Sequence, residues 1–237
     1  NANNLLLPGK FKEQTSILTN KPSLGMIHSG WNTINEKDEI IEVIKPWEKA
    51  PILSVETWIT ELPVKLGALM FRKTWLNDDL KFDPEMRQSQ DTDLLLQLAL
   101  AGCTCLWLKK STMSYRIHQK GTITINAYKQ HFYVKKVLDK FFSDQRIPEN
   151  ILSMESEIRF YTNIWSTWHA FRYNQLDEIN KSLNESFIYS PFSPMMTVLV
   201  WVNGFMRNCR GEVNLVKRLL YVLPDFYKSA RINNKKI

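Results

Sequence analysis

The stretch that decides the fold is Ser89–Gly102, "SQDTDLLLQLALAG", in which a short polar opening leads into an apolar run. The apolar residues recur at helical spacing, which predicts a helix with one buried face. Gly102 is a typical helix stop, because glycine adopts without steric penalty the left-handed backbone conformation that often follows the last turn of a helix. The two acids of the opening, Asp91 and Asp93, pose the functional question, since they fit either helix capping or catalysis.

Capping explains both acids without any catalytic role. Ser89 is a favourable N-cap, which places Asp91 and Asp93 in or near the first turn. The exposed amide hydrogens and the helix dipole favour negative charge at that position. Catalysis is the alternative, because a carboxylate at the lip of a cleft suits the work of a general base.

The composition indicates a globular protein. The chain has 237 residues, of which 44% are hydrophobic, enough for one large domain or two small ones. Its longest apolar run, Met195–Val202, is far shorter than the roughly 20 residues of a membrane-spanning helix. The cysteines, Cys103, Cys105 and Cys209, lack metal-ligand spacing. We therefore expect buried thiols, a reducing compartment and a cytoplasmic location.

The net charge of +7 is concentrated in the last part of the chain, because residues 203–237 contain eight lysines and arginines but only two acids. With Tyr221, Phe226 and Tyr227 interleaved, this segment could lie on an anionic membrane surface or a phosphate backbone. A solvated helix face is the other interpretation. We expect no nucleic-acid partner and allow peripheral contact with the inner face of a membrane.

The chain divides near residue 125. Before it, helical and strand patterns alternate, with helices expected at 8–20 and 52–62 and strands at 25–34, 40–44, 67–73, 103–108 and 112–118. After it, only helical spacing occurs, at 126–142, 149–174, 176–186, 191–208 and 212–228. We therefore predict an α/β domain at 1–125, followed by an all-helical domain at 126–237.

Several motifs surround the helix in a fixed order. A strand with a basic end, "GALMFRK", leads to Phe82-Asp83-Pro84-Glu85, then to Gln90-Asp91 at the helix start, and finally to Tyr115-Arg116-Ile117-His118. This order resembles the acceptor-side segment of family 2 inverting glycosyltransferases of the GT-A fold. The resemblance covers roughly residues 1 to 125, and it implies that this α/β part is a partial GT-A fold with a Rossmann-like mixed sheet.

The resemblance also implies roles for individual residues. Asp91 stands where the family places its catalytic base, and Gln90 and Asp93 belong to the same acceptor-side helix, with Gln90 in place of the family's usual glutamate. His118 and Arg116 match residues on the side of the diphosphate or the metal. The alternative for Arg116 and His118 is a strand end that faces solvent.

The family's metal motif falls at the first residues of the chain. By the family's spacing Asn1 and Asn3 replace its two aspartates, and neutral amide oxygens are weaker ligands for a hard cation than carboxylates. Alternatively, Asn1-Ala2 is the remnant of a cleavage scar. The resemblance implies a divalent metal, Mn or Mg, for the parent enzyme, and this chain itself need not bind one.

The reaction that the resemblance implies is transfer of a sugar from a nucleotide-sugar donor, such as a UDP-sugar, to a glycan or lipid-linked acceptor, as in the synthesis of cell-surface polysaccharides. The family's nucleotide-binding βαβ units are missing, so we expect this chain to be a C-terminal portion that is inactive alone. An incomplete sheet leaves an unpaired edge, which predicts a homodimer or a rearranged sheet. The competing hypothesis is a non-catalytic interaction or membrane-surface module.

Two features of the helical half carry open alternatives. The helix that contains Trp165, Trp168, His169, Phe171 and Tyr173 forms either a packed core or a sugar-stacking surface. The segment "SPFSPMMTVLVWVNGF", residues 190–205, could be a hydrophobic hairpin that docks on a bilayer or another subunit.

Overall fold

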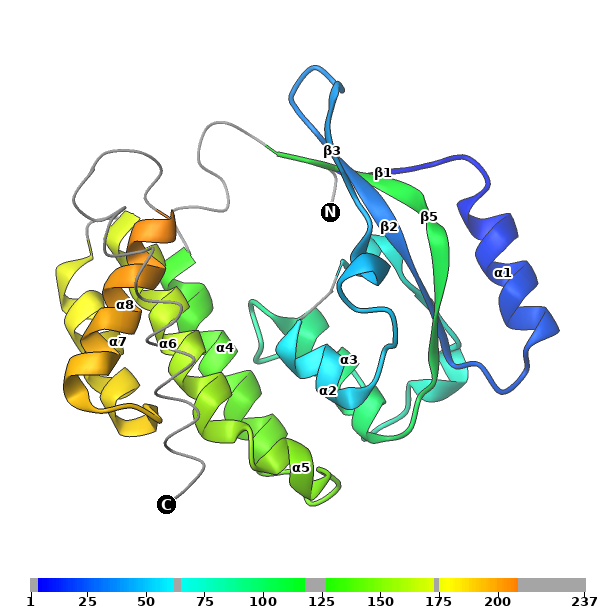
Figure 1. Ribbon diagram of the computed structural model, residues 1–237. Coiled ribbons are helices and arrows are strands. Elements are labelled where there is room, and N and C mark those ends of the chain that lie inside the picture. The colour runs from blue at the N-terminus through cyan, green and yellow to red at the C-terminus, as the bar shows by residue number, and fades with distance from the viewer. Residues whose placement is uncertain (1–3, 62–64, 118–126, 173–174, 209–237) are drawn as a thin grey trace. The chain divides into compact units, whose positions relative to one another are not determined.

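The computed structural model describes residues 4–61, 65–117, 127–172 and 175–208. The chain forms two compact units, Asn1–Leu152 and Ser153–Ile237 (Figure 1). The first unit combines a mixed β-sheet with helices, which agrees with the predicted α/β class, and the described part of the second is helical. Helices α4 (Ala127–Phe142) and α5 (Glu149–Leu152) belong to the first unit.

The sheet of the first unit has five strands among the described residues. Its order is β1 (Asn4–Leu6), β5 (Cys105–Arg116), β2 (Met26–Ile34) and β3 (Ile40–Ile44), and β4 (Met70–Phe71) also pairs with β2. β2 and β5 are parallel, whereas the other pairs are antiparallel. The carboxyl ends of β2 and β5 therefore lie at the same edge of the sheet.

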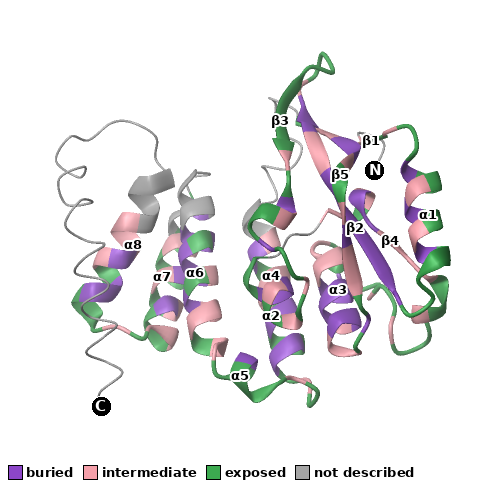
Figure 2. Cartoon of the chain, turned by 45° about the vertical axis from the view of Figure 1, so that its right-hand side comes forward, coloured by how far each residue is buried: buried purple, intermediate pink, exposed green. Residues whose placement is uncertain are grey.

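Strand β2 is buried on both faces. Seven of its nine residues are buried and the other two are half-buried, because helix α1 (Lys10–Asn20) covers one face and helices α2 (Val55–Thr60) and α3 (Gln90–Leu100) cover the other (Figures 1 and 2). This position explains why the strand's sequence does not alternate between apolar and polar residues, since helices cover both of its faces.

The two strands predicted at 103–108 and 112–118 are one strand, β5. The residues between the two predicted strands lie in a bulge of β5. Ser29 of β2 lies opposite Leu108 and the next residue, Gly30, lies opposite Ser111, so β5 carries extra residues at this point. Lys109 and Lys110 are exposed there, and pairing resumes beyond them.

Helix α3 confirms one predicted end and corrects the other. Gly102 has φ of 82°, and the amide hydrogens of Gly102 and Cys103 bond to the carbonyls of Ala99 and Leu98, the pattern of a Schellman motif. Ser89 does occupy the N-cap position, but its backbone is left-handed and its side chain makes no capping hydrogen bond. Capping by the Ser89 hydroxyl is therefore wrong, and the helix starts through the bond from the Asp93 amide to the Ser89 carbonyl.

Three other predicted elements are shorter than their patterns. α1 begins at Lys10 with Gly9 as its N-cap, so Pro8 precedes the helix and does not belong to its first turn. The helix expected at 52–62 is α2, which begins after Ser54, whose side chain accepts a bond from the Thr57 amide. The strand expected at 67–73 shrinks to β4, because Leu66–Ala68 form a 3-10 turn.

A buried polar network lies between α1 and the sheet. Lys10 is 4% exposed, and its ammonium donates to Gln14 Oε1 at 2.7 Å and to Thr112 Oγ1 at 3.3 Å. Thr112 shares a hydrogen bond of 2.6 Å with Ser29, and both Gln14 and Ser29 donate to the Ala68 carbonyl. Burial lowers the pKa of Lys10 to about 8, because a charged amine is costly where only neutral oxygens surround it.

The second unit contains three described helices, α6 (Glu155–Arg172), α7 (Leu176–Tyr189) and α8 (Pro194–Asn208). Its core is a cluster of Phe160, Ile164 and Val200, with further apolar side chains packed around it. Of the aromatic helix singled out above, Trp165 is 37% exposed, while the side chains of Trp168, His169, Phe171 and Tyr173 lie outside what is described. Ile188 in the last turn of α7 and Met195 in the first turn of α8 are largely exposed.

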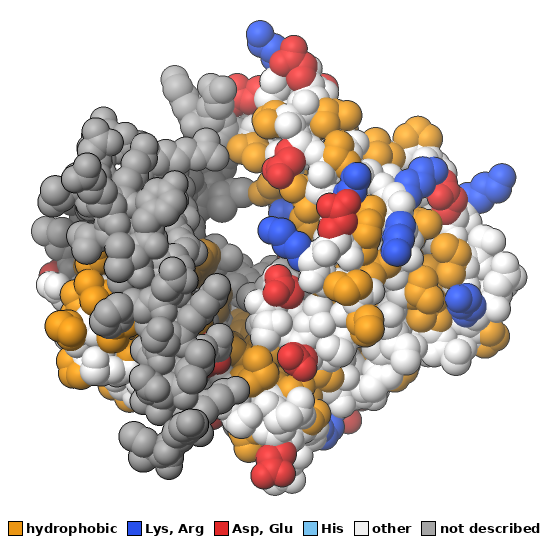
Figure 3. Space-filling view, viewed as in Figure 1, with side chains coloured by type: hydrophobic (Ala, Val, Ile, Leu, Met, Phe, Trp, Pro, Cys, Tyr) orange, Lys and Arg blue, Asp and Glu red, His pale blue; other side chains and the backbone are white. Residues whose placement is uncertain are grey.

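Hydrophobic side chains also reach the surface at strand β3. Ile40, Ile41 and Val43 are each about half exposed or more, with 59%, 60% and 49% of their surface accessible, and Figure 3 shows hydrophobic atoms below the charged tip of this hairpin. β3 is an edge strand, so it also has one unpaired side. In the described ranges, no helix is both long and apolar enough to span a bilayer.

Candidate functional site

Helix α3 places its two acids in different surroundings. Asp93 is 2% exposed, and its Oδ2 accepts hydrogen bonds from Gln97 Nε2 at 2.8 Å and from Lys140 Nζ of α4 at 2.9 Å. Lys140 also lies 3.5 Å from Asp83 Oδ2. Asp93 therefore attaches α3 to α4, and its carboxylate is committed to that contact.

Asp91 is half-buried, with part of its side chain accessible to solvent. In the described part of the chain, its carboxylate makes one hydrogen bond, in which Oδ1 accepts from the Thr92 amide at 3.0 Å. The remaining acceptor positions of this carboxylate are open to a ligand. Gln90, directly before it, is exposed.

Three further side chains gather beside the carboxyl-terminal halves of β2 and β5. The ammonium of Lys65 lies 3.6 Å from the centre of the Tyr115 ring and 5.9 Å from the centre of the Trp31 ring. Trp31 comes from β2 and Tyr115 from β5, and the negative charge of Asp91 acts on Lys65. We call Trp31, Lys65, Asp91 and Tyr115 the Lys65 cluster.

The position of the Lys65 cluster fits a general property of open α/β sheets, in which ligands bind outside the carboxyl ends of parallel strands. β2 and β5 are the parallel pair of this sheet, and Asp91, whose charge acts on Lys65, lies in the first turn of α3. The fold thus brings together an acid, a lysine and two aromatic rings from four separate segments of the chain.

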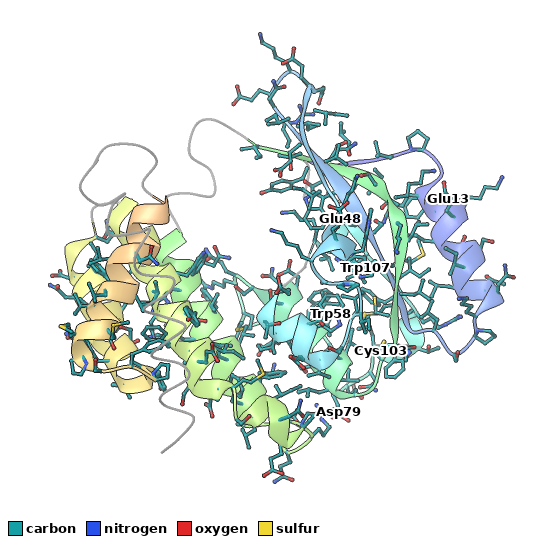
Figure 4. The ribbon with its side chains drawn as sticks, viewed as in Figure 1. Glu13, Glu48, Trp58, Asp79, Cys103 and Trp107 are labelled. Carbon is teal, nitrogen blue, oxygen red and sulfur yellow. The ribbon has the colours of Figure 1, made fainter. Side chains whose placement is uncertain are left out.

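The aromatic part of the cluster continues into a rigid core. Trp31 stacks on His28, with ring centres 6.2 Å apart, and His28 in turn lies 6.1 Å from Trp58 and 4.8 Å from Trp107. The indole of Trp107 donates to the Ala50 carbonyl at 2.7 Å. Figure 4 shows Trp58 and Trp107 between α2 and the sheet. Because these rings are buried, Trp31 has a fixed base to pack on.

The electrostatics of the cluster come from burial and from one opposing charge. Burial lowers the pKa of Lys65, while the negative charge of Asp91 raises it. Burial raises the pKa of the Tyr115 phenol, so this hydroxyl stays protonated at neutral pH and can both donate and accept a hydrogen bond. The cluster thus offers an acceptor at Asp91, a cation at Lys65 and a hydroxyl at Tyr115.

Arg116, predicted on the side of the diphosphate, is engaged elsewhere in the sheet. Its Nη1 lies 2.6 Å from Asp38 Oδ1 and donates to the Asn35 carbonyl at 3.3 Å. These partners belong to the turn between β2 and β3, so the guanidinium holds that turn in place. Its side chain is 18% exposed, which leaves little of it for a ligand.

The remaining predicted site residues are only partly covered by the structure. His118, Asn1 and Asn3 lie outside the described residues. Among the described residues, no three His, Cys, Asp or Glu side chains form a group that could hold a metal ion.

The two described cysteines, Cys103 and Cys105, show no sign of nucleophilic chemistry. Cys103 is buried and burial raises its pKa to about 12, and burial likewise raises the pKa of Cys105. Both thiols are therefore protonated at neutral pH, and a protonated thiol is a poor nucleophile. Cys209 lies outside the described residues, as does most of the basic segment 203–237.

Sequence reasoning missed Lys65, Trp31 and Tyr115. Tyr115 belongs to the motif Tyr115-Arg116-Ile117-His118, in which only Arg116 and His118 were predicted to face a ligand. Trp31 lies within β2 and is half-buried, so its sequence did not distinguish it from the buried residues around it. Lys65 gave no signal, since only the fold brings it over the Tyr115 ring. The sequence matches no model of a known protein family and no curated protein.

Proposed function

We propose that this chain is the acceptor-side portion of a family 2-like inverting glycosyltransferase, which transfers a sugar from a nucleotide-sugar donor to a glycan or lipid-linked acceptor. Asp91 is the base and the Lys65 cluster receives the acceptor. The observation that carries the proposal is the contrast within α3. Asp93 is buried and paired with Lys140, whereas Asp91 is partly accessible and close enough to Lys65 for its charge to act on that ammonium.

The accessible carboxylate of Asp91 suits general base catalysis. It takes the proton of the acceptor hydroxyl as the acceptor oxygen bonds to the sugar carbon. The bond between that carbon and the diphosphate oxygen breaks on the opposite side, which inverts the configuration and leaves the electron pair on the diphosphate. The hydroxyl-bearing ring of the acceptor would stack on Trp31 or Tyr115, since aromatic faces bind the apolar faces of sugars.

The donor side belongs to residues beyond those described. Under this proposal, the nucleotide is held by βαβ units that precede this segment in the complete protein, and the divalent metal of the family belongs to that side. The chain as it stands therefore binds a nucleotide sugar weakly or not at all. The complete protein works on the cytoplasmic side, with peripheral contact to a membrane.

Isothermal titration of a UDP-sugar with manganese tests this proposal on two proteins, the chain of 237 residues and a longer chain that adds the nucleotide-binding units. We expect binding by the longer chain only. In the longer chain, Asp91→Asn should retain donor binding and lose transfer. Asp79→Asn is the matched control, because Asp79 is an exposed acid outside the Lys65 cluster, and it should change neither.

A non-catalytic interaction module is the second candidate, and the apolar surface of β3 favours it. Ile40, Ile41 and Val43 are exposed on an edge strand, which is a common geometry for pairing with another chain. If the longer chain binds no nucleotide sugar, this candidate replaces the first. Sedimentation should then show a dimer of the chain that Ile41→Lys converts to a monomer.

A further inference from the structure

We propose that Lys65, Tyr115 and Trp31 form an anion-binding subsite beside Asp91, which takes the phosphate or carboxylate group of an acidic acceptor sugar. That the ligand is an acceptor sugar rests on the proposed function, whereas the binding of an anion at Lys65 does not. Lys65 differs in its surroundings from the other cations of the first unit.

The ammonium of Lys65 lacks a conventional partner. Of the described residues, none accepts a hydrogen bond from it and no carboxylate lies within ion-pair distance. Its contacts are the faces of Tyr115 at 3.6 Å and Trp31 at 5.9 Å. A lysine has three N–H donors, and a cation over an aromatic face is attracted to the ring without using all of them. Donors therefore remain for a ligand.

Other cations of this unit have partners, both the exposed Lys136 and Lys140 and the more buried Lys10 and Arg116. Lys140 pairs with Asp93, and Lys136 pairs with Glu85. Lys10, although it has no carboxylate within ion-pair distance in the described chain, donates to two neutral oxygens. Arg116 pairs with Asp38. Lys65 is half-buried and has none of these arrangements, so among these cations it is the one available to an incoming anion.

The aromatic rings make Lys65 a suitable anion receptor. They restrict where the ammonium can lie, so less side-chain entropy is lost when a ligand binds. The protonated Tyr115 hydroxyl adds a second donor for an anionic oxygen. A charged hydrogen bond in a half-buried site is stronger than a neutral one. An acidic sugar can place its anionic group on Lys65 and its ring against Trp31.

The negative charge of Asp91 should weaken the binding of an anion at Lys65. Its negative charge is near enough to act on Lys65, yet it lies beyond ion-pair distance, so it does not occupy the ammonium. An anion on Lys65 would therefore sit near Asp91 and be repelled by it. Removal of the Asp91 charge should then strengthen anion binding, whereas under the proposed function the same substitution abolishes transfer.

Titration of the 237-residue chain with glucose 6-phosphate, glucuronic acid and glucose at low ionic strength tests the subsite, with tryptophan fluorescence as the readout. We expect at least one acidic sugar to bind about tenfold more tightly than glucose. A preference for glucose 6-phosphate identifies a phosphate ligand, and a preference for glucuronic acid identifies a carboxylate. Equal affinity for all three sugars would overturn the proposal.

Three variants locate the binding. Lys65→Met keeps the apolar stem and should remove the tenfold preference, while Lys65→Arg should retain it. Lys12→Met is the control, because Lys12 is exposed on α1, on the opposite face of the sheet from α3. Circular dichroism checks that each variant folds. If Lys65→Met does not fold, Tyr115→Leu replaces it as the test, and it should weaken acidic-sugar binding severalfold. Preference for acidic sugars that survives both substitutions would contradict the subsite.

Asp91→Asn separates the failure of this inference from failure of the proposed function. We expect it to tighten acidic-sugar binding severalfold, whether or not the longer chain transfers sugars. If acidic sugars bind through Lys65 and no transfer occurs, the subsite stands and the proposed function fails. If transfer depends on Asp91 while Lys65→Met leaves acidic-sugar binding unchanged, the proposed function stands and the subsite fails.

Discussion

The two faces of the sheet each hold a lysine whose pKa burial lowers, and the two lysines differ in what surrounds them. On the face covered by α1, Lys10 donates to Gln14 and Thr112, and the network is closed. On the face covered by α3, Lys65 meets two aromatic rings and an acid at a distance. A closed network stabilises a core, whereas an open one is available to a ligand.

The largest expected effect tests the α3 face. Asp91→Asn in the longer chain should reduce transfer about a thousandfold, because general base catalysis contributes on the order of 10² to 10⁴ in rate. The free energy of unfolding should hardly change, since the Asp91 carboxylate accepts one described hydrogen bond, from its neighbour Thr92. Enzyme assays and chemical denaturation measure the two quantities. A variant that retains full transfer would remove Asp91 from catalysis.

The next largest effect is the pH dependence of stability that Lys10 causes on the face covered by α1. Lys10 has a folded-state pKa of about 8, below its ordinary value of 10.5, so between these pH values the unfolded chain binds more protons than the folded one. Stability from this group therefore rises as pH increases from about 8 to about 10.5, by on the order of 2 to 3 kcal/mol. Below pH 8 the penalty for the buried charge is constant.

Lys10→Met isolates this contribution from the other groups that titrate in the same range. Urea denaturation of the two proteins at several pH values should show a steeper increase for the wild type than for the variant. Lys12→Met, which removes an exposed lysine of the same helix, should follow the wild-type curve. Parallel curves for all three proteins would mean that Lys10 pays no penalty for its charge.

A smaller effect concerns the contact between α3 and α4. Lys140→Met removes the cation from the buried Asp93 carboxylate, which is 2% exposed. We expect a loss of about 2 kcal/mol, less than for a fully buried pair, because Lys140 itself is partly exposed. Lys136→Met is the control, since its partner Glu85 is 77% exposed and such surface pairs contribute little. Equal losses for both variants in thermal unfolding would contradict this difference.

The sequence predicted local elements better than the site. The boundaries of β2 and β3, and the helix stop at Gly102, follow from hydrophobic spacing and backbone freedom, which are properties of neighbouring residues. The break in β5 was mispredicted, because only pairing with β2 shows that Lys109 and Lys110 lie in a bulge. Lys65 reaches Tyr115 through the fold alone, and spacing along the chain contains no information about that contact.

The smallest effect separates the stability of α3 from its chemistry. Gly102 has a left-handed backbone, with φ of 82°, and a Cβ added there meets no atom within 4 Å. Gly102→Ala should therefore cost about 1 kcal/mol through backbone strain and not through a clash. Thermal unfolding measures this loss, and Gly102→Asn should cost less, since asparagine tolerates this conformation. Because the strain lies at the opposite end of α3 from Asp91, acidic-sugar binding should stay unchanged. A parallel fall in binding would mean that the Lys65 cluster depends on the whole helix and not on its first turn.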